Sequence, residues 1–94
     1  GPGAVDAPPG PIEVTAAGGD AWIQVRAGSA TGRVLHEGIL PVGQTLRFDR
    51  RTIWVRTGAA AFTVISRGDE TLLARDELIG TVEVLVTPRG LSPA

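Results

Sequence analysis

Short runs of alternating apolar and polar residues recur along most of the chain at a spacing of roughly ten residues, and this pattern limits the fold most. Three such runs, joined by turns that contain glycine, fill the stretch from Asp20 to Phe48. Apolar residues nowhere follow the period of an amphipathic helix, and the connections are too short for parallel crossovers. The sequence therefore predicts an all-β fold, a small antiparallel β-sandwich of about seven to eight short strands, Ig-like in size.

We expect the strands to follow the alternating runs and to end at turns rich in Gly, Pro and Asp. The third run loses its alternation at Gly38, which we interpret as a β-bulge. The predicted strands are 12–16, 21–27, 33–40, 45–48, 52–56, 60–66, 70–73 and 80–87. Their inward parity predicts a core of Ile23, Val25, Val34, Leu46, Phe48, Ile53, Val55, Phe62, Val64, Val82, Val84 and Val86.

The two ends of the chain differ from the alternating part. Residues 1–11 are rich in Pro and Gly, which block both helix and sheet, so we expect a flexible leader. Its opening Gly-Pro resembles a protease-cleavage scar, and the Pro-rich remainder is typical of a linker in a longer protein. We expect one domain over residues 12–88 and, beyond Pro88, a frayed tail over residues 89–94.

Composition excludes several classes of function. The formal net charge is -1, from 9 cations and 10 anions, so we expect no attraction to nucleic acid or to anionic lipid. The absence of cysteine excludes disulfides, thiolate nucleophiles and cysteine-ligated zinc. No apolar run approaches the roughly 20 residues that span a bilayer, so any membrane attachment would need a helix that this sequence lacks.

The residues that could act in catalysis do not form a recognisable set. His36 is the single histidine, and its neighbour Glu37 points to the opposite side of a strand, so it cannot easily orient the imidazole. Ser29 and Ser66 lack the setting of a hydrolase nucleophile. We interpret His36 as a structural or rim histidine, partly inward and on the same side as Val34, and we expect no enzyme activity.

The acidic pairs are better explained as turn residues than as ligands. Asp69-Glu70 and Asp76-Glu77 offer carboxylate oxygens, but their spacing does not match a calcium-binding loop. We therefore expect no metal and no cofactor.

Two tryptophans are the strongest candidates for a binding role. Alternation places Trp22 with Arg26, and Trp54 with Arg56, on the polar side of strands whose other side is Ile and Val. An aromatic ring beside arginine is suited to a protein partner or a sugar ring. These four residues are the predicted partner-binding site, although each ring would instead extend the core if another segment covered it.

The order of the motifs resembles a known family. The segments W-I-Q-V-R and G-R-V-L-H-E-G-I-L-P-V-G-Q-T-L-R-F, followed by I-W-V-R-T-G-A-A-A-F-T-V and R-G-D, are similar to the C-terminal domain of RodZ-type proteins over about Ala21 to Thr87. This chain departs from that pattern in an enlarged first hairpin loop at 29–31, in His36, and in Thr57-Gly58 where Asn-Ala is usual.

The resemblance implies a bacterial membrane protein of cell-shape maintenance and wall elongation. Such proteins have a cytoplasmic helix-turn-helix part that binds the actin homologue MreB, one transmembrane helix, and this β domain on the extracytoplasmic side of the plasma membrane. The chain contains neither the cytoplasmic part nor the span, so we expect it to bind neither MreB nor nucleic acid.

Two functions remain open from the sequence. The first is a non-enzymatic interaction domain that contacts other cell-wall elongation proteins or peptidoglycan. The alternative is a small carbohydrate-binding module that presents its tryptophans to peptidoglycan. The all-β pattern, the missing catalytic set and the resemblance favour the first.

Overall fold

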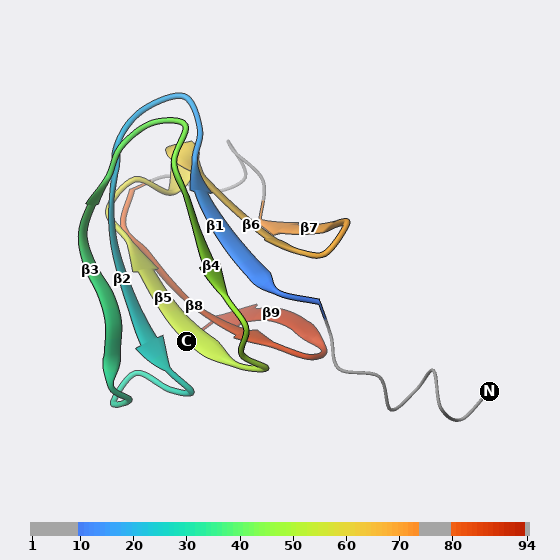
Figure 1. Ribbon diagram of the computed structural model, residues 1–94. Coiled ribbons are helices and arrows are strands. Elements are labelled where there is room, and N and C mark those ends of the chain that lie inside the picture. Colours follow the sequence, from blue (N-terminus) through green and yellow to red (C-terminus); the bar gives the residue numbers. More distant parts are fainter. Residues whose placement is uncertain (1–9, 74–79, 94) are drawn as a thin grey trace.

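The chain forms two antiparallel sheets packed face to face in the computed structural model, which describes residues 10–73 and 80–93 (Figure 1). The four-stranded sheet has the order β4-β1-β6-β7, and the five-stranded sheet has the order β3-β2-β5-β8-β9. The strands are β1 Ile12–Ala16, β2 Ala21–Ala27, β3 Val34–Leu40, β4 Thr45–Phe48, β5 Ile53–Thr57, β6 Thr63–Arg67, β7 Glu70–Leu73, β8 Val82–Thr87 and β9 Gly90–Pro93. One short 3-10 helix, η1 Ala60–Phe62, precedes β6. The all-β sandwich is confirmed.

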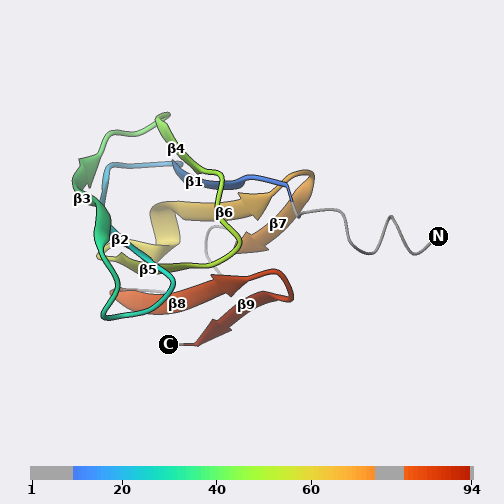
Figure 2. The ribbon, with the colours of Figure 1, turned by 60° about the horizontal axis from the view of Figure 1, so that its bottom comes forward.

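The core lies between the two layers, which Figure 2 shows stacked with β4, β1, β6 and β7 on one side. Alternation supplies it: in β1 every second residue is buried, and the same period holds along most of β2 and β6. Of the predicted core, six residues are buried and three are partly buried against the core. The six are Ile23, Val25, Ile53, Val55, Val84 and Val86, and the three are Leu46, Phe48 and Val82.

The predicted position of the bulge in β3 is wrong. The register shifts between Val25 and Arg26, which face His36 and Val34, so Leu35 is the extra residue. Gly38 sits in regular register opposite Ile23. The bulge turns Val34 to the outer face, where it is 42% exposed, whereas His36 faces inward. Val34 is therefore not a core residue, and it does not share a side with His36.

The predicted strand 60–66 also has the wrong parity. The chain first makes η1, and β6 then begins at Thr63. As a result Thr63 and Ile65 are buried, Val64 faces outward opposite Thr15, and Phe62 is 38% exposed. Val64 and Phe62 thus lie outside the core.

Hydrogen bonds explain why threonine replaces an apolar residue at this point of the core. The Thr63 hydroxyl donates to the Ala59 carbonyl at 2.8 Å, so the Thr57 hydroxyl, 2.8 Å away, donates to Thr63. The Ala59 N–H in turn donates to Thr57 Oγ1 at 3.1 Å. Each buried hydroxyl is satisfied, so burial carries no large penalty.

Arg67 ties the two sheets together at one end of the sandwich. It ends β6 and is only 8% exposed, although the predicted strand stops at residue 66. Its Nη1 donates to the Thr87 carbonyl of β8 at 2.5 Å, and its Nη2 donates to the Arg51 carbonyl at 3.0 Å. The guanidinium thereby joins the four-stranded sheet to the five-stranded sheet.

The end of the chain is more ordered than the sequence predicts. We expected residues 89–94 to fray, but Gly90–Pro93 forms β9, which pairs with β8 from Thr87↔Gly90 to Val84↔Pro93. Pro88 and Arg89 form the connecting turn, and Leu91 packs against the core. Residues 1–9, for which we predicted a flexible leader, lie outside the described residues.

Candidate functional site

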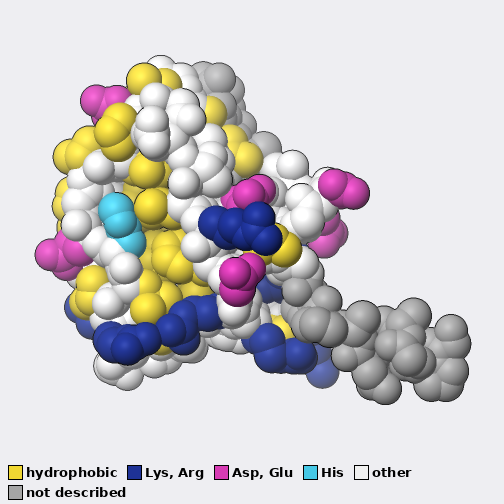
Figure 3. Space-filling model, in the orientation of Figure 1, with side chains coloured by type: hydrophobic (Ala, Val, Ile, Leu, Met, Phe, Trp, Pro, Cys, Tyr) yellow, Lys and Arg dark blue, Asp and Glu magenta, His cyan; other side chains and the backbone are white. Residues whose placement is uncertain are grey.

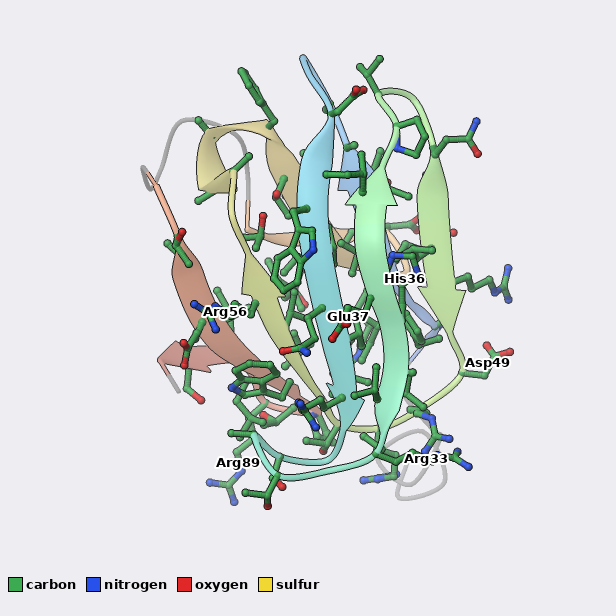
Figure 4. The ribbon with its side chains drawn as sticks, turned by 90° about the vertical axis from the view of Figure 1, so that its left-hand side faces the viewer. Arg33, His36, Glu37, Asp49, Arg56 and Arg89 are labelled. Atoms are coloured by element: carbon green, nitrogen blue, oxygen red, sulfur yellow. The ribbon has the colours of Figure 1, made fainter. Side chains whose placement is uncertain are left out.

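The outer face of the five-stranded sheet carries all four predicted site residues, and Figure 4 looks directly at it. Cross-strand register fixes their placement. Trp22 lies opposite Ile39, Gln24 opposite Arg56, and Arg26 opposite Trp54. Because directly opposed residues in antiparallel strands share a face, both tryptophans lie on the outer side, as alternation predicts.

Trp54 lies on this outer face but is only 5% exposed. It stands on the central strand β5, with Arg26 of β2 and Leu85 of β8 directly opposite it. The ring is not part of the interlayer core. Its Nε1 is buried and has no hydrogen-bond partner among the described residues. Little of the ring is therefore left for a partner.

Arg26 is held by its own hairpin and is half-buried. Its Nη1 donates to the Gly32 carbonyl at 2.9 Å, across the enlarged loop that joins β2 to β3. This bond keeps the arginine stem beside Trp54, where a long aliphatic stem can cover apolar surface. Arg26 therefore stabilises the outer face, and less of its side chain is left to contact a partner.

A polar row crosses the middle of the same face. Gln24 Nε2 donates to Glu37 Oε1 at 2.5 Å, and Arg56 Nε lies 3.8 Å from Glu83 Oε2. Arg56 and Glu83 side chains are 46% and 43% exposed. Exposed pairs of this kind add little to stability, so their groups remain free to exchange partners. Figure 4 shows Glu37 and Arg56 projecting from this face.

An apolar patch adjoins that row at one end of the sandwich. Ile39 is 60% exposed, Val42 54% and Phe62 38%, and the half-buried Trp22 faces Ile39. We call this set, Trp22, Ile39, Val42 and Phe62, the apolar end. Ile39, Val42 and Phe62 were not among the predicted site residues. Ile39 lies two residues after Glu37 and therefore on the same outer side of the strand. The bulge predicted at Gly38, between the two residues, prevented this inference.

Hydrogen bonds from backbone N–H groups hold the connections of the apolar end. The Val42 N–H donates to Asp20 Oδ1 at 2.8 Å, and the Ala17 N–H donates to the Phe62 carbonyl at 2.8 Å. The Phe62 ring lies against Gly19, where a Cβ would come within 2.8 Å of it. The apolar groups are therefore displayed on fixed loops, which lowers the entropy lost on binding.

His36 lies away from this face, on the inner side of the edge strand β3 (Figure 4). It is half-buried opposite Val25, and its Nε2 is buried without a hydrogen-bond partner among the described residues. Of the acidic pairs, Asp69 and Glu70 are exposed, whereas Asp76 and Glu77 lie outside the described residues. The inward placement of His36 agrees with the sequence-based expectation.

The described residues contain neither a cluster of metal ligands nor a helix that could span a membrane. Within residues 10–73 and 80–93, no three His, Cys, Asp or Glu side chains are grouped as metal ligands would be. In the same ranges, none of the helices has the length and apolar character that a bilayer span requires.

Comparison with known proteins identifies the family. A family model of the RodZ C-terminal domain matches residues 13–75, which run from β1 to the end of β7. No curated protein and no solved structure gave a significant match. The matched residues include the tryptophans, both arginines and the whole apolar end. The match covers more than half of the sequence, and the chain belongs to the RodZ C-terminal domain family of cell-shape proteins.

Proposed function

We propose that this chain is a non-enzymatic interaction domain of a RodZ-like protein, which binds other cell-wall elongation proteins on the extracytoplasmic side of a bacterial plasma membrane. The observation that carries the proposal is the apolar end, where Ile39 and Val42 are more than half exposed beside a polar row. Exposed apolar side chains gathered next to exchangeable polar groups are typical of a protein interface.

The residues would divide the binding work by their exposure. Trp22 and Ile39 are suited to be the centre of the interface, since they lie opposite each other and tryptophan is enriched among hot spots. Arg56 is suited to the polar rim, where it can exchange Glu83 for a partner carboxylate. Trp54 and Arg26 would act indirectly, by stabilising the face of the sheet that carries Trp22 and Arg56.

Membrane attachment belongs to the same proposal. The full protein would carry a transmembrane helix and a cytoplasmic part N-terminal to this domain. Reading the gene upstream tests this directly: an apolar run of about 20 residues supports it, and a polar upstream sequence without one contradicts it.

The alternative is the carbohydrate-binding module, for which peptidoglycan would be the ligand. It relies on exposed aromatic platforms, and Trp54 offers only 5% of its surface, so the interaction domain is the better-supported function. Titration of the isotope-labelled domain with muropeptides discriminates the two. Amide shifts centred on Trp22 at millimolar ligand would favour the carbohydrate function over the proposed one.

The proposal is tested by capture of purified elongation proteins. The variant Trp22→Ala/Ile39→Ser should bind at least about 30-fold more weakly, the usual loss at a hot spot. The matched control is Val34→Ser, which removes an exposed apolar side chain from the same strand but from its other end. Capture that is equal in both variants, with unfolding transitions that show both are folded, would contradict the proposal.

A further inference from the structure

The two ends of the sandwich carry different side chains. In the five-stranded sheet, Ala27 pairs with Ile53, and Ile53 with Val86, so the connections that follow β2, precede β5 and follow β8 share one end. The Arg67 bonds to the Thr87 and Arg51 carbonyls bring the end of β6 to the same place. The connections there are 28–33, 49–52, 68–69 and 88–89.

Four exposed arginines occupy this end, and we call them the arginine end. They are Arg33, Arg50, Arg51 and Arg89, and none makes an ion pair within the described part of the chain. Figure 3 shows most Lys and Arg side chains along the lower edge of the molecule, and Figure 4 labels Arg33 and Arg89 there.

Few acidic groups offset these charges. Three acidic residues lie at this end: Asp49, which pairs with Arg47 at 3.6 Å, the exposed Asp69, and the exposed Glu70, which begins β7 opposite Arg67. At the opposite end, the connections 17–20, 41–44 and 58–62 contain a single charged residue, Asp20. The charge of the described part is therefore polarised along the strands.

We propose that the arginine end docks on the anionic headgroups of a lipid bilayer. Guanidinium groups bind phosphate oxygens in a bidentate manner. Here they come from three separate connections, an arrangement that fits an extended anionic surface better than one small anion. The inference rests on the proposed membrane attachment of the full protein.

The entry point of the chain supports this orientation. β1 begins at Ile12, which pairs with Phe48 and Arg67, so it starts at the arginine end. The Gly68 N–H donates to the Pro11 carbonyl at 3.3 Å, which places the residue before β1 at that end as well. An anchor N-terminal to the domain would thus hold the arginines toward the membrane and the apolar end away from it.

The net charge of -1 does not oppose this docking. Charges interact across about 8 Å at physiological salt, whereas a strand of seven residues spans about 23 Å. The arginines therefore act on a nearby bilayer largely without the acids at the other end. The sequence-based expectation of no attraction to anionic lipid used the net charge of the whole chain, which does not show where the charges lie.

Vesicle sedimentation tests the inference with the full 94-residue chain. It should bind vesicles of phosphatidylcholine mixed with phosphatidylglycerol, should not bind phosphatidylcholine alone, and should dissociate as NaCl is raised. Arg89→Gln should weaken binding about fivefold and Arg50→Gln/Arg51→Gln about 25-fold, from the usual contribution per arginine. The matched control Arg56→Gln removes one charge from the middle of the sheet and should change nothing.

Several results would overturn the inference. These are equal binding to neutral vesicles, no binding to anionic ones, or equal losses for Arg89→Gln and Arg56→Gln. Binding to soluble polyphosphate without binding to vesicles would assign the arginines to a soluble anion instead. Capture of elongation proteins separates the two proposals. Arg89→Gln and Arg50→Gln/Arg51→Gln should leave capture unchanged, whereas Ile39→Ser should weaken capture and leave vesicle binding intact.

Discussion

Trp54 is buried on the outer face of its sheet, which no second layer formed by residues 10–73 and 80–93 covers. Its neighbours on that face, Arg26 and Leu85, flank it, and the bond from Arg26 to the Gly32 carbonyl fixes one of them. Alternation predicted the side on which the ring lies but not its exposure, because exposure depends on where neighbouring side chains fold. Trp22, by contrast, is half-buried next to an exposed Ile39.

The two tryptophans should therefore respond differently to truncation and to quenchers. Trp54→Ala should lower the free energy of unfolding by about 3 to 5 kcal/mol, the usual cost for a buried tryptophan, and Trp22→Ala by less. In Trp22→Phe, the remaining Trp54 should resist iodide quenching, and in Trp54→Phe the remaining Trp22 should be quenched. Equal quenching in the two variants would show that Trp54 is exposed in solution. Urea unfolding and fluorescence supply both measurements.

Arg67 is a buried cation that the fold uses as a connector. Burial lowers the pKa of its guanidinium, the nearby Arg51 lowers it further, and Glu70 raises it. A lowered pKa means that the charged form is less favourable in the folded than in the unfolded state, so stability from this group would grow only at pH values near its own pKa. That range lies far above neutral pH, since an arginine guanidinium stays protonated throughout the neutral range.

Replacement of Arg67 should test the connector. Arg67→Met removes the bonds to the Thr87 and Arg51 carbonyls and should cost about 2 kcal/mol, less than two full charged hydrogen bonds because the desolvation penalty is also removed. The unfolding free energy of Arg67→Lys should lie between those of the wild type and Arg67→Met, because a single ammonium group replaces the two-pronged guanidinium. The cost should be the same at about pH 6 and about pH 9, because the guanidinium stays charged throughout. An unfolding free energy that Arg67→Met leaves unchanged would contradict the connector role.

The β2–β3 hairpin shows how one element is fixed by a close backbone approach. Its loop is closed by Ala27 N–H donating to the Arg33 carbonyl at 2.8 Å and Gly32 N–H donating to the Ser29 carbonyl at 3.0 Å. A Cβ on Gly32 would lie 1.7 Å from the Ala27 carbonyl oxygen. Only glycine fits there, and Gly32 also supplies the acceptor for Arg26.

The hairpin can be tested with a matched pair of glycines. Gly32→Ala should destabilise the domain by more than about 2 kcal/mol, because the clash is with backbone and cannot be relieved by a rotamer change. Gly58→Ala should be nearly neutral, since its Cβ would meet Trp22 Cβ at an ordinary 3.7 Å. Thermal unfolding of the two variants gives the comparison. Similar stabilities would mean that the loop adjusts freely.

β1, β2 and β4 begin and end at the predicted residues, because their side chains alternate with an unbroken period of two. β7 also has the predicted bounds, although residues 70–73 do not alternate and the register with β6 shifts between Ile65 and Ser66. The errors in β3 and β6 have two causes. The inserted residue Leu35 moves Val34 to the other side of β3, and the turn η1 moves the inward-facing positions of β6 by one residue. β9 was missed because Pro88 reads as a stop, whereas here it occupies a two-residue hairpin turn.

The candidate site was predictable only in part for the same reason. Parity within single strands correctly placed Trp22, Arg26, Trp54 and Arg56 on one face. The apolar end requires knowing that Ile39 pairs with Trp22 and that two distant loops meet beside them. Such long-range pairing is not contained in local alternation.

On the scale of the whole molecule, the strands separate an arginine end from an apolar end. The matched family segment ends at residue 75, yet its strand β5 pairs with β8, which lies beyond the match. β8 also places Leu85 beside Trp54 and Glu83 beside Arg56. The outer face is therefore completed by residues outside the matched family segment.

The most direct test of the proposed interaction face is crosslinking in living cells. A photoreactive amino acid at Ile39 of the full protein should capture wall-elongation proteins, whereas one at Thr45, exposed on the outer face of the other sheet, should not. Capture from Ile39 alone is the result that we predict. Equal capture from both positions, or capture from Thr45 alone, would contradict the assignment of this face.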